Sequence, residues 1–267
     1  MANPTRRLLR KPAGVPRSGD ILRFRCNLCD APNAVPFEAL GREVPSCSGC
    51  GSTVRFRAIG RLLARELVGH DQALCRMRPD RSIRGIGLTD SGSYASLLAQ
   101  RFDYVNTFYD ADPRLDITDV PDDLAHRFRF VVASDVFEHV PAPAARAFAG
   151  ARRLLDRNGF LLLTVPFSLE TQTVEHYPDL HAFRIEGAGD SAVLHNVTRD
   201  GRAQRFERLV FHGGSGATLE MRRFCRTGLE FELRQAGFSR IRFADEAFAD
   251  FGIAWPEPFG VPVVARP

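Results

Sequence analysis

The stretch FVVASDVFEHVPAP, residues 130–143, begins as a short apolar run and ends in charged and titratable side chains. Its first five residues predict a buried strand. Asp135, Glu138 and His139 follow directly, and two prolines then prevent the strand from continuing. In open α/β sheets, parallel strands present ligand-binding groups at their C-terminal ends. The stretch therefore predicts a parallel sheet with a functional site at the end of this strand.

Strand-like and helix-like segments alternate on both sides of this stretch. Apolar runs rich in β-branched and aromatic residues predict strands at residues 82–88, 103–110, 127–137, 160–167, 239–245 and 261–266. Helical periodicity predicts helices at residues 93–102, 142–159 and 227–238, the second of which ends at Asn158-Gly159. This alternation is typical of an α/β fold with a doubly wound sheet, which we place at residues 81–267.

The first strand-to-helix turn reads GIGLTDSGS and contains Gly85, Gly87 and Gly92. Asp90 stands where the dinucleotide fingerprint requires glycine, which disfavours NAD and FAD, and no lysine follows as in a P-loop. Asp110 lies 23 residues after Gly87, at the expected end of the second strand. Because two carboxylate oxygens match a ribose diol, the pattern favours an adenosine-containing ligand without a pyrophosphate.

The block VVASDVFEHVPAPAARAFAGARRLLDRNGFLLLTVPF resembles the fourth strand, the following helix and the fifth strand of class I S-adenosylmethionine-dependent methyltransferases, in particular the small-molecule branch. The resemblance implies a Rossmann-like sheet of seven strands, the last antiparallel, and S-adenosylmethionine as cofactor. It places the three turn glycines against the methionine part, Asp110 at the ribose, Asp119 near the adenine amine and Asp135 by the methyl group. The sequence departs from the family at Gly85, where an acid is often found.

A sulfonium methyl group is already an activated electrophile, so the enzyme must align a nucleophile, exclude water and accept a proton from a hydroxyl acceptor. His139 is our first candidate for the base and His176 the second; the alternative for both is a local structural role. Residues 168–220 interrupt the alternation and are expected to form a substrate lid, with a hairpin turning at Asp200-Gly201. Glu175, His176, His181, His195 and His212 lie in this lid, where they would bind polar substrate groups or stabilise the loop. A second metal site in the lid is a further alternative, although no ligand spacing supports it.

Four cysteines near the N-terminus follow the pattern C-x2-C-x17-C-x2-C: Cys26, Cys29, Cys47 and Cys50. Two such knuckles can place four sulfurs around one zinc ion, and a site with four cysteine ligands is structural because it has no open position. Two disulfides, four unrelated thiols and an iron–sulfur centre are the alternatives. Cys75 and Cys225 are isolated and are expected to be buried.

Residues 1–80 contain 14 lysines and arginines against 7 acids, whereas residues 81–267 contain 22 against 25. We therefore predict a flexible basic arm at 1–19 and a zinc ribbon with a basic helix at 20–80. Arginines 55, 57, 61 and 65 would flank that helix, either gripping phosphates or simply solvating it.

Three function classes follow from these features. The first is methyl transfer to an oxygen or nitrogen of a small polar or glycan-type acceptor. The alternatives are an RNA methyltransferase whose ribbon grips RNA, and a non-catalytic cofactor-binding or zinc scaffold protein. Without an apolar leader or an 18-residue apolar run, a cytoplasmic location with no membrane partner is expected. Nothing in the sequence indicates the oligomeric state.

Overall fold

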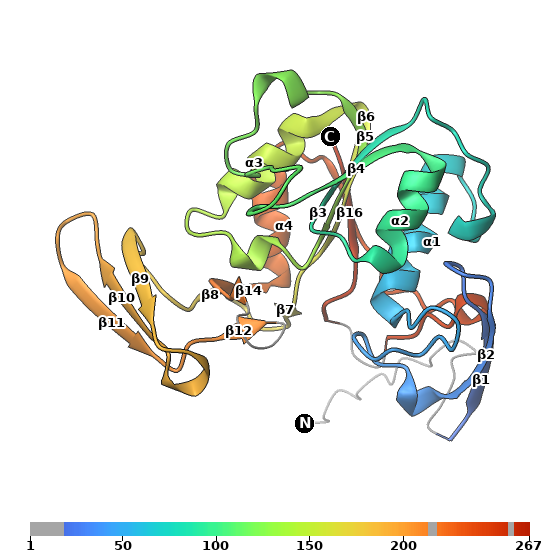
Figure 1. Cartoon of the computed structure of the whole chain (residues 1–267), viewed down its shortest axis with the longest axis horizontal. Helices are drawn as coiled ribbons and strands as arrows, with labels where there is room; N and C mark the ends of the chain where they lie inside the picture. Colours follow the sequence, from blue (N-terminus) through green and yellow to red (C-terminus); the bar gives the residue numbers. More distant parts are fainter. Residues whose placement is uncertain (1–18, 213–217, 256–258) are drawn as a thin grey trace, which may run out of the picture.

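The computed structural model of the chain describes residues 19–212, 218–255 and 259–267 (Figure 1). Most of the predicted basic arm, residues 1–18, lies outside this range. Within the described part, the main sheet has six strands in the order β15 (Arg240–Phe243), β16 (Val263–Arg266), β6 (Leu155–Thr164), β5 (Phe128–Ser134), β3 (Arg84–Leu88) and β4 (Asp103–Thr107). Strand β16 is antiparallel to both of its neighbours, and the other pairings are parallel.

The expected reversal of the final strand is thus confirmed, but the described sheet has one strand fewer than the seven implied by the resemblance. Beyond β4, the chain forms one isolated bridge, Phe108 to Arg114, and then turns through residues 115–121. The outer edge of the sheet next to β4 is therefore unpaired within the described residues.

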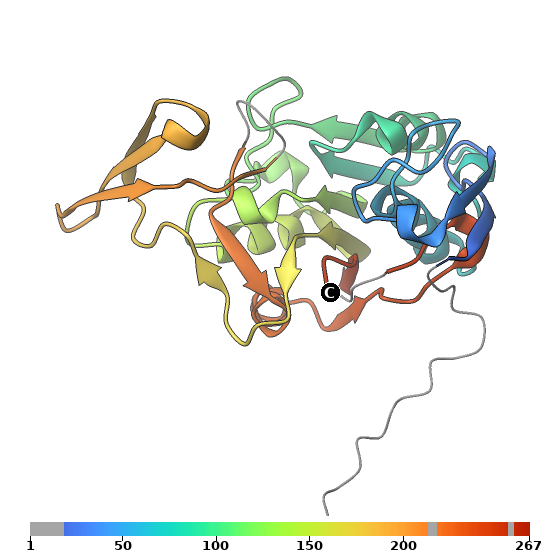
Figure 2. The ribbon, with the colours of Figure 1, turned by 90° about the horizontal axis from the view of Figure 1, so that it is seen from below.

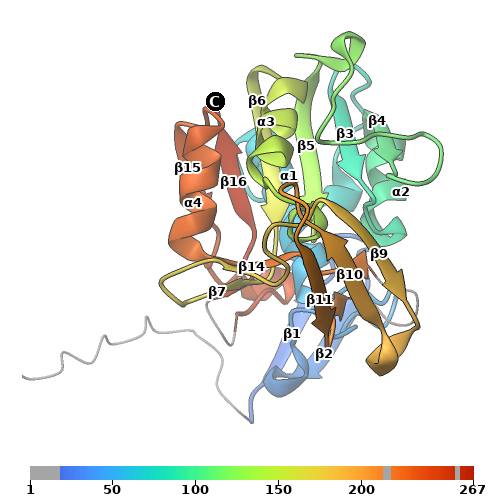
Figure 3. The same cartoon turned by 90° about the vertical axis from the view of Figure 1, so that its left-hand side faces the viewer.

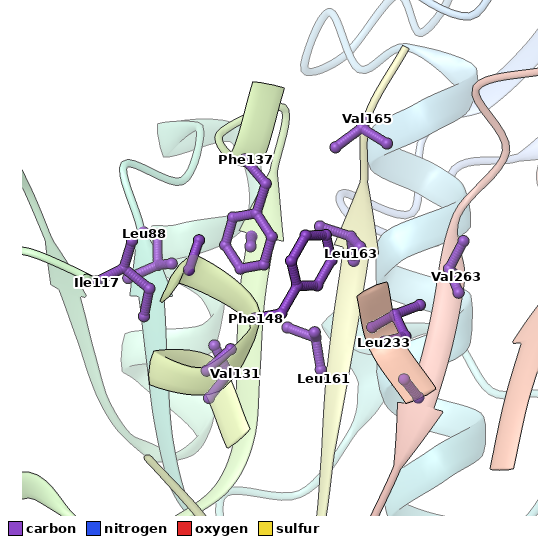
Figure 4. Packing of buried hydrophobic residues seen from close by; sticks show 14 of the residues in the cluster. Leu88, Ile117, Val131, Phe137, Phe148, Leu161, Leu163, Val165, Leu233 and Val263 are labelled. Atoms are coloured by element: carbon purple, nitrogen blue, oxygen red, sulfur yellow. The ribbon is translucent and has the colours of Figure 1, made fainter. Parts of the chain in front are cut away.

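Helices cover both faces of the sheet. Helices α1 (Val54–Val68) and α2 (Gly92–Arg101) lie on one face, and α3 (Ala145–Leu154) and α4 (Arg226–Gln235) lie on the other (Figures 1 and 3). Side chains alternate along the strands, so Val131 and Leu161 pack toward α3 and α4 while Phe130 and Leu162 pack toward α1 and α2. Figure 4 shows the α3–α4 side, where Phe148 of α3 lies against Phe137 and the sheet.

Helix α3 ends earlier than predicted. It stops at Leu154, and Leu155 already belongs to β6, where it pairs with Phe128 of β5. Residues 156–159 then form an irregularity before Phe160 resumes the pairing opposite Phe130. The polar Asn158-Gly159 pair marks this irregularity rather than the end of the helix.

The ribbon, residues 20–53, contains the hairpin β1 (Ile21–Arg25) and β2 (Pro32–Pro36). Its Phe24 and Leu28 belong to the same buried cluster as Ile59 and Leu62 of α1 and Phe130 and Leu162 of the sheet. The ribbon and α1 therefore share one hydrophobic core with the sheet.

The insertion, residues 168–220, begins within β7 (Phe167–Ser168), whose second residue is the first residue of the insertion. It contains β8 (Val174–Glu175), β9 (Ala182–Glu186), β10 (Val193–Val197), β11 (Ala203–Glu207), β12 (Phe211–His212) and β13 (Thr218–Leu219). Strands β9, β10 and β11 form an antiparallel sheet that projects away from the main body (Figures 1 and 2). The predicted hairpin is confirmed: β10 pairs with β11, and Gly201 at the turn has φ +83°. Strand β14 (Arg222–Cys225) then pairs with β7 and β8.

Six short 3₁₀ helices complete the described elements, at Phe37–Ala39, Leu74–Arg76, Asp122–Leu124, Phe137–His139, Gly189–Ser191 and Ala249–Phe251. Every helix in the described part of the chain is too short or too polar to span a bilayer.

Candidate metal centre and strand-end site

The four cysteines predicted to bind zinc come together. Their Sγ atoms all lie within 4.8 Å of one another, with 3.7 Å between Cys26 and Cys50 and 3.5 Å between Cys29 and Cys47. All four are free thiols, so the disulfide alternative is not realised here. Sulfurs bound tetrahedrally to zinc at about 2.3 Å are about 3.8 Å apart, so the spacing fits this ion.

The arginines of α1 differ from the expectation of a basic outer face. Arg57 is 0% exposed and Arg61 is 6% exposed. Arg57 donates hydrogen bonds to the ribbon and to residues 251–252, and Arg61 pairs with Asp71 at 2.8 Å. Arg55 is largely buried and contacts Glu43. Only Arg65, with a 40% exposed side chain, resembles the predicted surface arginine. This arrangement does not offer a phosphate-binding surface on α1.

The three glycines predicted in one turn lie in two elements, Gly85 and Gly87 within β3 and Gly92 at the start of α2, and they serve different purposes. A Cβ at Gly85 would lie 2.0 Å from the ring of Phe130, so glycine is required there by packing between β3 and β5. A Cβ at Gly87 would lie 2.0 Å from the Tyr104 hydroxyl and 2.2 Å from Asp90. At Gly92, the first residue of α2, a Cβ would have no neighbour within 4 Å apart from the adjacent residues and the helix backbone, so packing does not require glycine there.

Asp90 is the centre of a buried polar network beneath this turn. The hydroxyls of Tyr94 and Tyr104 each donate to its carboxylate at 2.7 Å, and its backbone N–H donates to Asn106. Burial raises the pKa of Asp90 to about 7, although the two tyrosine hydrogen bonds act in the opposite direction. The preceding Thr89 has φ +55°, a left-handed conformation that glycine adopts more easily. The network therefore holds Thr89 in a left-handed conformation at the start of the turn.

Asp110 and Asp119, expected at the ribose and the adenine, are both exposed. Asp110 lies three residues beyond the end of β4, and the N–H of Asp119 donates to the Asp116 carbonyl in the following turn. Both acids lie in the segment that follows β4 and are accessible to a ligand.

Asp135 directly follows β5 and has φ +56°, in the left-handed region. Arg42 of the ribbon donates to both of its carboxylate oxygens, at 2.7 and 2.9 Å, and the Thr164 hydroxyl donates at 2.8 Å. Burial alone would raise the pKa of Asp135, but the hydrogen bonds and the charge of Arg42 outweigh it and hold the pKa below its usual value. The ribbon is thus attached to the end of the strand where the resemblance places the methyl group.

The 3₁₀ helix Phe137–His139 presents Glu138 and His139 next to β14. Glu138 is 0% exposed, and neither of its carboxylate oxygens has a hydrogen-bond partner among the described residues. Burial, together with the charge of Asp135, raises the pKa of Glu138 well above its usual value. His139 donates from Nδ1 to the Leu219 carbonyl at 2.9 Å, and burial lowers the pKa of its ring.

Two histidines of the insertion reach the same place. His176 Nε2 contacts Glu220 Oε1 at 2.7 Å, and His212 Nε2 contacts the other oxygen of Glu220. The rings of His139 and His212 pack edge to face, 5.2 Å apart. The remaining candidates of the insertion lie elsewhere: His181 is exposed, His195 is near Glu186, and Glu175 pairs with Arg222.

Sequence reasoning did not identify three groups that complete this site: Arg42, Glu138 as an unpartnered acid, and Glu220. Glu138 was visible in the opening stretch, beside His139. Arg42 and Glu220 have no local signal, because each reaches its partner only through the tertiary fold.

No protein-family model matches the chain, and no curated protein sequence matches it. Among solved structures, it is similar to a sugar N-methyltransferase from Streptoalloteichus (16% identity, 82% of this chain and 90% of that one, TM-score 0.46). It is also similar to an amino pentose methyltransferase from Micromonospora echinaspora (16% identity, 81% of this chain and 93% of that one, TM-score 0.45). A carbon methyltransferase matches at 14% identity and TM-score 0.46 over 80% of this chain and 55% of that chain.

The mostly parallel sheet with its reversed final strand, covered by helices on both faces, is the doubly wound α/β architecture predicted from the sequence. The solved structures it resembles include methyltransferases of nitrogen and of carbon. At these identities the likeness concerns the fold and says nothing of the acceptor.

Proposed function

We propose that this protein transfers a methyl group from S-adenosylmethionine to an oxygen or nitrogen of a small, polar, sugar-like molecule. One observation carries the proposal. At the end of β5, acids and histidines from the strand end and from the insertion come together, and Glu138 and Glu220 among them are buried. Such a cluster of titratable groups at the C-terminal edge of a parallel sheet is suited to bind and activate a polar acceptor.

The turn after β3 and the segment after β4 would hold the cofactor. At the start of α2 the Ser91 side chain already caps the N–H of Ser93, and Gly92 is exposed, so we place the carboxylate of the cofactor beside Gly92. Asp110 and Asp119 are exposed and able to accept hydrogen bonds from the ribose and the adenine amine. Gly85 contributes indirectly, because it allows Phe130 to pack under β3. When bound, the cofactor supplies a methyl group on a positively charged sulfur.

His139 and His176 are the residues that we propose to act on the acceptor, beneath the insertion. In the transfer, the acceptor heteroatom forms a bond to the methyl carbon while the carbon–sulfur bond breaks and its electron pair remains on sulfur. A hydroxyl or ammonium acceptor must also lose a proton. His139 has Nε2 free because Nδ1 is used by Leu219, and His176 is oriented by Glu220.

Calorimetry with S-adenosylmethionine and its demethylated product tests the cofactor assignment. We expect both to bind, and Asp110→Ala to weaken binding by about 1.5–3 kcal/mol, the value of hydrogen bonds to a charged group. Asp123→Ala, which changes an exposed acid away from this edge, is the matched control. Absence of binding to the wild-type protein would remove the proposal, whereas equal affinities for wild type and Asp110→Ala would remove only the ribose assignment.

Methyl transfer should be screened against amino sugars, sugar nucleotides and small hydroxylated acids. On an accepted substrate, His176→Gln should lower kcat by about 10²-fold or more if the ring takes part in proton transfer. His181→Gln changes an exposed histidine of the same insertion and should leave kcat unchanged. A change in KM alone for His176→Gln would reduce this residue to a positioning role.

A further inference from the structure

Three potential metal ligands converge at the end of β5. We propose that Glu138, His139 and His212 bind a divalent transition-metal ion of the zinc type, separate from the four-cysteine centre. Their ligand atoms all lie within 4.8 Å of one another. Glu138 Oε1 lies 3.8 Å from His139 Nε2 and 3.9 Å from His212 Nδ1. Ligands held tetrahedrally at about 2.1 Å from zinc are about 3.4 Å apart, so the two histidine–glutamate distances are a few tenths of an ångström longer than those of an occupied site.

Glu138 supplies the strongest indication that an ion belongs here. Its side chain is 0% exposed, and both carboxylate oxygens lack a hydrogen-bond partner in the described part of the chain. A buried carboxylate without a partner is costly, because it has lost water and gained nothing in return. A cation held jointly with two neutral imidazoles would satisfy it.

Both imidazoles are already oriented as ligands. His139 donates through Nδ1 to the Leu219 carbonyl, which leaves the lone pair on Nε2 free toward Glu138. His212 contacts the Glu220 carboxylate through Nε2, which leaves Nδ1 free on the side of Glu138. Metal-bound histidines characteristically donate their second ring N–H to a carbonyl or a carboxylate, and this site has one of each.

Two histidines and one glutamate are also the donor set of catalytic zinc sites that keep a fourth position for water or substrate. Here the ligands come from both sides of the site, since His212 belongs to β12 of the insertion and the other two follow β5. The ion would therefore fix the insertion over the strand end. Its fourth position would accept an acceptor oxygen and make that oxygen easier to deprotonate. The deprotonation of an acceptor at the ion rests on the proposed function. With the ion bound, His139 would act on the acceptor as a metal ligand and not by taking the proton itself.

Zinc counting on the full-length protein tests the site without any substrate. After equilibration with excess zinc and removal of loosely bound ion, the wild type should hold about two zinc ions per chain, one at each centre. Glu138→Gln and His212→Ala should each hold about one. His195→Ala changes a half-exposed histidine of the same insertion, near Glu186, and should still hold two.

One zinc per saturated wild-type chain would overturn the proposal, as would two in both ligand variants. The wild-type count decides the question even if a variant fails to fold, and urea unfolding identifies such a failure. The result is independent of the methyltransferase proposal: a protein with two zinc ions and no methyl transfer would keep the metal site and lose the proposed function.

Discussion

Arg57 joins three parts of the chain inside the shared core, and replacing it with alanine should strongly destabilise the protein. Its guanidinium donates to the Phe251 and Gly252 carbonyls at 2.8 Å, to the Ser52 carbonyl at 2.6 Å and to the Ser46 hydroxyl at 3.0 Å. The side chain is 0% exposed, so alanine would leave these acceptors buried and unpaired. It would also remove a positive charge that interacts with all four cysteines of the cluster.

An unsatisfied buried polar group costs about 1–3 kcal/mol, and neighbouring groups partly relax toward water. We therefore expect Arg57→Ala to lower the free energy of unfolding by about 3–5 kcal/mol, the range measured when one partner of a buried charged network is removed. Arg57→Lys keeps the charge but cannot reach all the acceptors with one ammonium group, so its free energy of unfolding should lie between those of the wild type and Arg57→Ala.

Urea unfolding followed by circular dichroism, with zinc in the buffer, measures this difference. Arg65→Ala is the matched control, since Arg65 is on the same helix, is 40% exposed and contacts Glu246 at 3.5 Å. An exposed pair of this kind contributes at most about 1 kcal/mol. If Arg57→Ala is no more destabilising than Arg65→Ala, the buried network is not stabilising and our interpretation of α1 is wrong.

Three further predictions concern the ribbon and the turn. Replacing Cys47 with serine should remove the tightly bound zinc of the cysteine centre, measured by elemental analysis, and should lower the thermal unfolding midpoint of the whole protein; an unchanged midpoint would contradict the shared core. A double-mutant cycle of Arg42→Ala and Asp135→Asn should give a coupling free energy of about 1–3 kcal/mol in urea unfolding, and a value near zero would show that this pair does not hold the ribbon. Because the folded pKa of Asp90 is about 7 and an unfolded Asp titrates near 4, stability should fall by up to about 4 kcal/mol as pH rises from 4 to 8. Urea unfolding of Asp90→Asn across this range should lack that component, and identical pH profiles would refute the shifted pKa.

The main features of the sheet were predictable because its signals are local. Each strand is a short apolar run, and each is separated from the next by a helical or polar segment. The end of α3 was not predictable, since Leu155 continues the apolar pattern of the helix and becomes a strand residue only by pairing with Phe128. The surface role expected for Arg57 and Arg61 was wrong for a similar reason, because only the tertiary fold brings carbonyls and acids to them.

The candidate site was predictable where the residues are close in sequence. Asp135, Glu138 and His139 were visible together, and the four cysteines were identified by their spacing. The convergence of His212 and Glu220 on that position depends on how the insertion folds back onto the strand end. Neither the periodicity nor the spacing of residues in the sequence predicts that the insertion folds back onto the end of β5.

The common core of the ribbon and the sheet also limits how this gene can be shortened or recombined. Deleting the codons for the first 53 residues would expose to water the residues of α1 that share a buried cluster with the ribbon. A fragment encoding only residues 81–267 would lose α1 as well, and should accumulate as an aggregate rather than as a smaller enzyme. In this protein, the cysteine-containing segment cannot be exchanged like an accessory module, and if the four cysteines bind zinc as we expect, a cell short of zinc would produce less of the whole folded chain.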